Sequence, residues 1–166
     1  VLPETPPSKQ WPALAYDSSL GFWETSFIRA RELLQSGDYR PDLPGRGREV
    51  YDVLVRMIIS RDTNMQRLIT RYFTLQDILD VRKRLIGTGL IGGKTVGMLL
   101  ARSILRKTDP EFAEVLEEHD SFYVGSDVFY DFLVRSGVWW VRQKQRDPQH
   151  FLEGAEQARQ RILTGE

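Results

Sequence analysis

Apolar residues recur at a helical spacing through most of the chain. Between residues 49 and 60 they fall at positions i, i+4, i+7 and i+8, which gathers them on one face of an α-helix. Six or seven segments of this kind are predicted to be helices. The clearest cover residues 22–35, 49–60, 62–72, 74–86 and 95–106, with further helices after residue 125 and at the end of the chain. We therefore expect a mainly α-helical protein.

A capping box is predicted at Thr74-Leu-Gln-Asp77. In this motif the first side chain accepts a hydrogen bond from the backbone of the third helical residue, whose own side chain accepts one from the first residue's N–H. The helix that begins there has a predicted apolar inner face that extends to Leu85 and Ile86. Glycines from Gly87 onward then end it.

Residues 121–125 have the aromatic and β-branched composition of a short strand. The sequence predicts one or two short strands in all. A lone strand leaves backbone N–H and C=O groups without partners, and the chain does not obviously supply a partner strand. We therefore expect residues 121–125 to lie at an edge, beside helices with partly exposed apolar side chains. The lack of an initiating Met and the end at Glu166, just past a helix, add to one expectation: the chain is the N-terminal fragment of a larger α+β protein.

The composition is that of a globular protein, with 41% hydrophobic and 28% charged residues. Lys plus Arg and Asp plus Glu both number 23, so the net charge is near zero. This balance argues against a general nucleic-acid or membrane-surface role, since both need surplus positive charge. The chain has no cysteine, which favours a reducing, cytoplasmic location, and it has no apolar run long enough to span a bilayer.

The segment that suggests chemistry is Gly87-Thr-Gly-Leu-Ile-Gly-Gly-Lys-Thr95. Its glycines match the dinucleotide-binding fingerprint G-x-G-x-x-G, but that fingerprint requires a strand directly before it, and residues 80–86 have a charged, helical pattern. Its end also matches the P-loop ending G-K-[ST]. The leading glycine of a P-loop would fall at Thr88, however, so neither motif is favoured.

A different phosphate-binding turn is the third interpretation. Gly92 and Gly93 let the backbone approach a ligand closely, and we expect at least one of them to have a positive φ or to lie against that ligand. Lys94 adds a positive charge in the first turn of a helix, whose N-terminus already favours anions. The alternative is a structural helix cap and linker with an exposed lysine.

Two segments resemble the opening of the nucleotide-binding domain of the phosphoenolpyruvate synthase and pyruvate phosphate dikinase family. They are Ile91-Gly-Gly-Lys-Thr-Val-Gly-Met-Leu-Leu-Ala-Arg102 and Asp120-Ser-Phe-Tyr-Val-Gly-Ser-Asp-Val-Phe-Tyr-Asp-Phe-Leu133. In that family a Gly-Gly-Lys turn starts a helix, and a short strand then runs into a Ser/Thr-capped helix. The resemblance implies an ATP-grasp-like, PEP/pyruvate-binding domain in which Lys94 contacts ATP phosphates while Gly92 and Gly93 shape the turn.

This resemblance covers about residues 87–137 and implies three parts of the chain. Residues 1–20, rich in proline, are an extended N-terminal segment. Residues 21–86 are an added helical region, and residues 87–166 are the incomplete start of the nucleotide-binding domain. One departure is Glu118-His-Asp120, where many family members have Pro-Pro-Gly.

The implied parent protein is an ATP-dependent phosphotransferase with ATP and Mg²⁺ as cofactors and a small acid as acceptor. The family's second ATP motif, its metal-binding carboxylates and its phosphohistidine segment do not occur in this sequence. We therefore expect the chain alone to be inactive, and we assign it no catalytic or metal-binding residue. The alternative function is a non-catalytic helical interaction domain whose glycine turn is structural.

Overall fold

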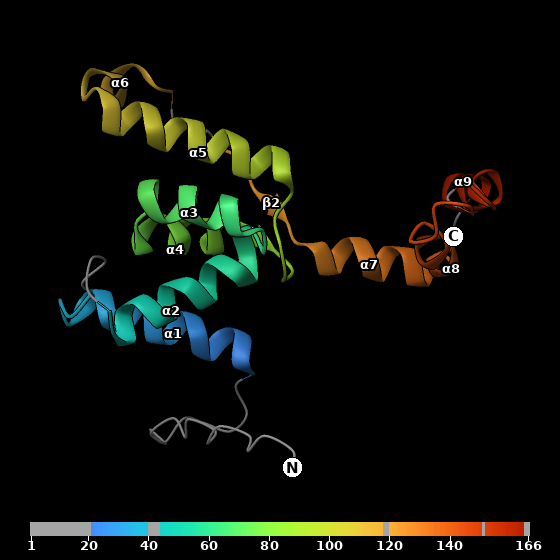
Figure 1. The fold of residues 1–166 in the computed structure, drawn as a ribbon, viewed down its shortest axis with the longest axis horizontal. Helices are drawn as coiled ribbons and strands as arrows, with labels where there is room; N and C mark the ends of the chain where they lie inside the picture. The colour runs from blue at the N-terminus through green and yellow to red at the C-terminus, as the bar shows by residue number, and fades with distance from the viewer. Residues whose placement is uncertain (1–20, 40–43, 118–119, 151, 165–166) are drawn as a thin grey trace, which may run out of the picture.

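The computed structural model describes residues 21–39, 44–117, 120–150 and 152–164. The predicted N-terminal segment 1–20 lies outside these residues. Within the described ranges the chain forms nine α-helices, one π-helix and one two-stranded sheet (Figure 1). The prediction of a mainly helical protein is confirmed. The helices outnumber the predicted six or seven, and two of them are short: α6 (Glu111–Val115) and α8 (Trp139–Lys144).

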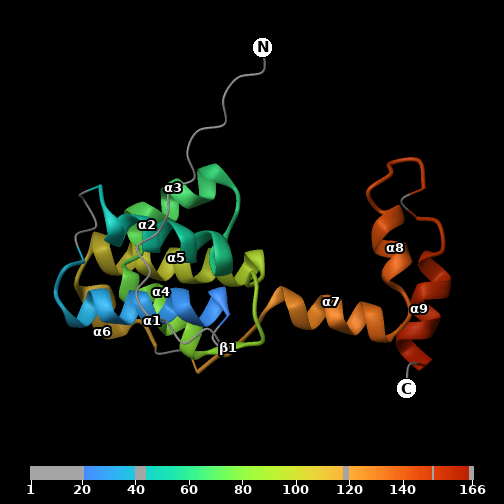
Figure 2. The same cartoon turned by 90° about the horizontal axis from the view of Figure 1, so that it is seen from below.

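The larger part of the molecule is a layered stack of helices (Figures 1 and 2). Helix α1 packs on α2 and α4, and α3 packs on α5. The elements of this stack are α1 (Phe22–Gln35), α2 (Arg46–Leu54), the π-helix η1 (Val55–Ile59), α3 (Thr63–Tyr72), α4 (Leu75–Lys83) and α5 (Gly93–Thr108). The predicted capping box opens α4: Asp77 N–H donates to Thr74 Oγ1 over 3.2 Å, and Thr74 N–H donates to Asp77 Oδ2 over 2.6 Å.

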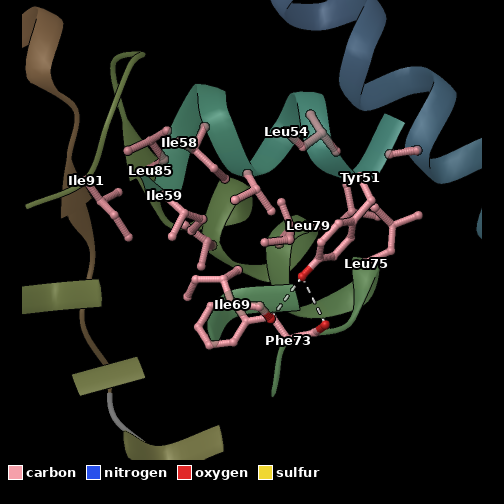
Figure 3. Packing of buried hydrophobic residues seen from close by; sticks show 14 of the residues in the cluster. Tyr51, Leu54, Ile58, Ile59, Ile69, Phe73, Leu75, Leu79, Leu85 and Ile91 are labelled. Carbon is pink, nitrogen blue, oxygen red and sulfur yellow. Dashed lines mark hydrogen bonds between the residues drawn. The ribbon is translucent and has the colours of Figure 1, made fainter. Parts of the chain in front are cut away.

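One hydrophobic cluster fills the stack. Its centre is completely buried and comes from four elements (Figure 3). These residues are Leu54, Ile58, Ile69, Leu75 and Ile78. The buried Tyr51 hydroxyl donates to the carbonyls of Ile69 (3.2 Å) and Phe73 (3.1 Å), which ties α2 to the end of α3. Burial raises the pKa of Tyr51, so this donor keeps its proton. The cluster also includes Leu85, Ile91, Val96, Leu100 and Tyr123, so it contains residues on both sides of position 86/87.

The sheet pairs β1 (Leu85–Ile86) with β2 (Tyr123–Val124) in parallel, with α5 and α6 in the crossover between them. Two expectations are corrected here. The helix predicted to reach Ile86 ends at Lys83, and the strand at residues 121–125 has a partner within the chain. Pairing between the two strands causes both differences. The carbonyl of Arg84 accepts a hydrogen bond from the Tyr123 N–H over 2.8 Å, and Leu85 is buried in the paired sheet.

The sheet has one buried and one exposed face. Leu85 and Tyr123 are 7% and 5% exposed, whereas their neighbours Ile86 and Val124 are both 49% exposed. Among the described residues β2 pairs on one side only. Apolar side chains on the helix that follows are also exposed, including Phe129 at 52%. The expected edge position beside exposed apolar residues is therefore confirmed.

Helix α7 (Ser126–Arg135) leads away from the stack in both views, and α8 and α9 (Ala155–Thr164) lie at its far end (Figures 1 and 2). A second, much smaller cluster forms there, made of Leu133, Val138, Val141 and Ala158, with both tryptophans of α8 packed against it. Across the described ranges, every helix is too short or too polar to cross a lipid bilayer.

Candidate functional site

The glycine-rich turn connects β1 to α5. Gly87 and Gly89 have φ of 75° and 81°, the left-handed region in which glycine carries no steric cost. Gly92 has φ of −68° and ψ of 150°, and Gly93 is the first residue of α5. Neither Gly92 nor Gly93 therefore has a positive φ, and the other part of the expectation, that the backbone here lies against a ligand, stays a prediction. Helix α5 begins two residues earlier than predicted, and the chain has already reversed direction at Gly87 and Gly89.

The first turn of α7 holds this glycine turn in place. Asp127 accepts from the Thr88 N–H over 2.7 Å with Oδ1 and from the Thr88 hydroxyl over 2.9 Å with Oδ2. Ser126 Oγ accepts from the Leu90 N–H over 3.1 Å. The sequence predicts that Ser126 or Asp127 caps this helix, but the N-cap is Gly125 and α7 has no side-chain cap. The side chains of Ser126 and Asp127 reach across to the other turn instead.

The two turns fit closely because three glycines lack a side chain. A Cβ on Gly87 would lie 2.5 Å from Val128 Cγ2, and one on Gly89 would overlap Ser126 Oγ. A Cβ on Gly125 would overlap the carbonyl oxygen of Thr88 and lie 2.8 Å from its carbonyl carbon. These glycines are therefore explained by packing between the two turns.

This arrangement bears on the two nucleotide motifs. Strand β1 does come directly before the glycines, contrary to the helical pattern of residues 80–86. Dinucleotide-binding turns and P-loops bind phosphate with successive backbone N–H groups. Here the Thr88 and Leu90 N–H groups are bonded to Asp127 and Ser126, so the first half of the segment is occupied by the protein's own oxygens.

The N-terminus of α5 is different, because it is exposed and has no side-chain cap. The first-turn N–H groups of Gly93, Lys94 and Thr95 have no intrahelical acceptor, and no described residue accepts from them. A Cβ on Gly92 or Gly93 would meet no atom within 4 Å beyond its own helix backbone. Neither packing nor φ therefore requires glycine at these two positions.

The side chain of Lys94 is exposed and forms no ion pair with any described residue. Its ammonium group belongs to the same turn as the three open N–H groups. The positive end of the helix dipole and a lysine together favour a bound anion. The three predicted site residues, Gly92, Gly93 and Lys94, are thus brought together by the start of α5, and the geometry suits a phosphate or carboxylate group.

The contact between Asp127 and Thr88 predicts a pH-dependent stability. Partial burial raises the pKa of the Asp127 carboxyl, but the hydrogen bonds from Thr88 outweigh this and leave the pKa below its usual value. A depressed folded-state pKa stabilises the fold above the unfolded value of about 3.9, and this stabilisation is lost as the pH falls through the folded pKa. Asp127→Asn should therefore reduce unfolding free energy at pH 7 by about 1–2 kcal/mol.

Urea unfolding of both proteins between pH 7 and pH 2.5 measures this difference, which should shrink toward the acid end. Asp131→Asn is the matched control, because Asp131 lies on the same helix and forms its ion pair with the exposed Arg135. A constant difference between the Asp127→Asn variant and the parent protein at all pH values would contradict the charged hydrogen bond.

Comparisons with known proteins add no relative: no family model matches the chain, and no curated protein or solved structure matches it. The assignment of function therefore depends on the residues themselves. Within the described ranges, no three His, Cys, Asp or Glu side chains gather into a group that would hold a metal ion.

Proposed function

We propose that this chain forms one wall of the ATP site in a larger ATP-dependent phosphotransferase that resembles phosphoenolpyruvate synthase. The observation that carries the proposal is the open start of α5. Gly92 and Gly93 leave the backbone accessible although neither packing nor φ requires glycine there, and Lys94 in the same first turn carries an exposed positive charge. In this proposal the phosphates of ATP lie against that turn.

The crossover from β1 through α5 to β2 supports the proposal by fixing the start of α5. Ile91 N–H donates to the carbonyl of Ile58 in η1 over 2.9 Å, and the turn before it is held by the first turn of α7. A binding turn on a rigid scaffold keeps its donors oriented before the ligand arrives. The hydrogen bonds of Ser126 and Asp127 are therefore positioning contacts in this proposal.

The exposed face of the sheet gives a second line of support. Parallel sheets normally have both faces covered, yet Ile86, Val124 and Phe122 are 49%, 49% and 68% exposed. In the proposed parent protein the remainder of an ATP-grasp-like domain covers this face. Helix α7 follows β2 directly, and its exposed apolar side chains would extend the same interface.

The role of Lys94 in such a protein is electrostatic. Phosphoryl transfer relies on cations that neutralise phosphate oxygens, and the Lys94 ammonium is one such cation. Mg²⁺ in this proposal arrives with the nucleotide, because the described residues form no cluster of three or more carboxylate or histidine side chains around a possible metal position. The carrier histidine and the site for the small acid belong to the rest of the parent protein. The 166-residue chain alone should bind ATP weakly or not at all and show no turnover.

Lys94→Ala tests the proposal in the longer protein. The substitution should weaken ATP binding at least about 10-fold, the scale of one lost charge-assisted contact. Isothermal titration with ATP and Mg²⁺ measures the affinity, and steady-state kinetics measure the KM for ATP. Lys107→Ala is the control, because it removes a lysine from the opposite end of the same helix. Unchanged ATP affinity in the Lys94→Ala protein would remove this residue from the site.

Gly93→Ala separates the proposal from the alternative of a non-catalytic interaction domain. Alanine fits the open space at this first helical position and should stabilise the fold by about 0.4–1 kcal/mol, because it restricts the unfolded chain. If ATP lies against the backbone, the same methyl group should weaken ATP binding despite the more stable fold. If the turn is only structural, the variant gains stability and ATP binding is absent or unchanged.

A further inference from the structure

A cavity of about 430 Å³ lies between the end of α4, the middle of α5 and strand β2. Its apolar side is formed by Phe73, Val81 and Leu99. This volume is in the range of small-molecule sites, which combine an apolar lining with a few polar groups that orient the ligand. The lining residues on α5 run from Leu99 to Arg106, which places them about 7.5 to 18 Å from Lys94 along the helix at a rise of about 1.5 Å per residue.

The polar side of the cavity has an excess of positive charge. Four cationic side chains and two carboxylates line it: Lys83, Arg84, Arg102, Arg106, Asp77 and Asp80. Both carboxylates have other partners. Asp77 is part of the capping box of α4, and Asp80 accepts from Lys83 over 2.8 Å and from Gln76 over 2.9 Å. Neither carboxylate forms an ion pair with Arg102 or Arg106.

The two arginines of α5 that line the cavity form no ion pair with any described residue. Arg102 and Arg106 are four residues apart, so they project from one face, where like charges repel. Arg102 donates to the carbonyl of Glu117 over 2.6 Å, a neutral acceptor. Arg106 has no ion pair or hydrogen bond with any residue that the structure describes. A bound anion would turn this repulsion into attraction.

Strand β2 and the end of α4 complete the polar side. Arg84 donates to the Ser121 carbonyl over 3.3 Å and lies 3.8 Å from the exposed carboxylate of Asp120. Burial raises the pKa of the Tyr123 phenol, while the charges of Arg84 and Arg102 oppose that rise. Arg84, Arg102 and Tyr123 all line the cavity, so both guanidinium groups share it with the phenol.

We propose that this cavity binds a small organic phosphate monoester. The phosphate lies between the guanidinium groups of Arg102 and Arg106, with Arg84 opposite, and the apolar part of the ligand lies against Phe73, Val81 and Leu99. Guanidinium groups match phosphate oxygens in pairs of parallel hydrogen bonds. A phosphate monoester carries close to two negative charges at neutral pH, which suits several arginines better than a single carboxylate does.

A titration of the ¹⁵N-labelled 166-residue chain with phenyl phosphate at pH 7.5 tests the proposal. Saturable amide shifts are expected around the cavity, at Val81, Leu99 and Ser103. Arg106→Gln should weaken the affinity about 10-fold without unfolding the chain, because Arg106 is exposed and makes no described contact. Arg142→Gln, which removes an arginine from distant α8, should leave the affinity unchanged.

Titrations with three other ligands and with one further variant complete the test. Inorganic phosphate and benzoate should bind more weakly than phenyl phosphate, and phenol should not bind. Absence of saturable shifts, equal binding by phenol or benzoate, or full affinity in the Arg106→Gln chain would each overturn the proposal. Lys94→Ala should leave phenyl phosphate binding intact. Its loss in that variant would move the site to the start of α5 and also overturn the proposal.

Discussion

Replacement of Gly125 by alanine is expected to destabilise the protein by about 3 kcal/mol, the upper part of the range for overpacking. The added Cβ would overlap the carbonyl oxygen of Thr88 and lie 2.9 Å from Asp127 Oδ1. A backbone carbonyl cannot rotate aside as a side chain can. The turn after β1 must therefore move away from the start of α7, which breaks the hydrogen bonds of Ser126 and Asp127.

Urea unfolding measures the loss, and amide exchange at Thr88 and Leu90 shows whether the contact between the two turns has opened. Gly97→Ala is the matched control, because Gly97 lies inside α5 and a Cβ there would meet no atom within 4 Å beyond its own helix backbone. That substitution should stabilise the protein by about 0.5–1 kcal/mol. A Gly125→Ala protein as stable as the parent would show that the two turns are not packed as described.

Local patterns in the sequence predict much of the helical stack. The helix at α1 is predicted with the same bounds, and the capping box at Thr74 forms with both of its hydrogen bonds. These features depend on residues close together in the chain, so the sequence contains them directly. The sheet does not follow in this way. Leu85 continues a helical apolar pattern, and only pairing with Tyr123, far along the chain, makes the segment a strand.

In the candidate site, too, the sequence predicts the features that depend on neighbouring residues and not those that depend on distant ones. Gly92, Gly93 and Lys94 are adjacent in sequence, and the structure places them together at the start of α5. Local patterns do not reveal the roles of Gly87 and Asp127, because their contact joins turns about 40 residues apart and a Ser-Asp pair after a strand also fits a helix cap. Local patterns also do not predict the cluster of arginines around the cavity, because these residues come from separate segments of the chain. Arg84 and Arg106 are 22 positions apart in the sequence, and they line one cavity only because the fold places α5 across it from α4 and β2.

Substitution of Ile58 by alanine is expected to cost about 2–5 kcal/mol, the range for removing a large side chain from a closed core. Ile58 is completely buried in the main cluster, which also contains Val96 and Leu100 of α5. If the stack unfolds as one unit, the loss should lower amide-exchange protection equally in α2, α4 and α5. Leu68→Ala, at a site 43% exposed, is the control and should have a much smaller effect.

The same measurement distinguishes the stack from the far end of the molecule. Val138 is 1% exposed, but its cluster contains only three other buried residues among those described. Regions with few buried apolar contacts open at a lower free energy than the global unfolding. Val138→Ala should therefore lower protection in α8 and α9 and leave α2 to α5 unchanged, while Ile58→Ala should do the reverse. Loss of protection in Ile58→Ala that stops before residue 87 would instead show that residues 21–86 and the segment from Gly87 onward fold as separate units, as the predicted domain boundary requires.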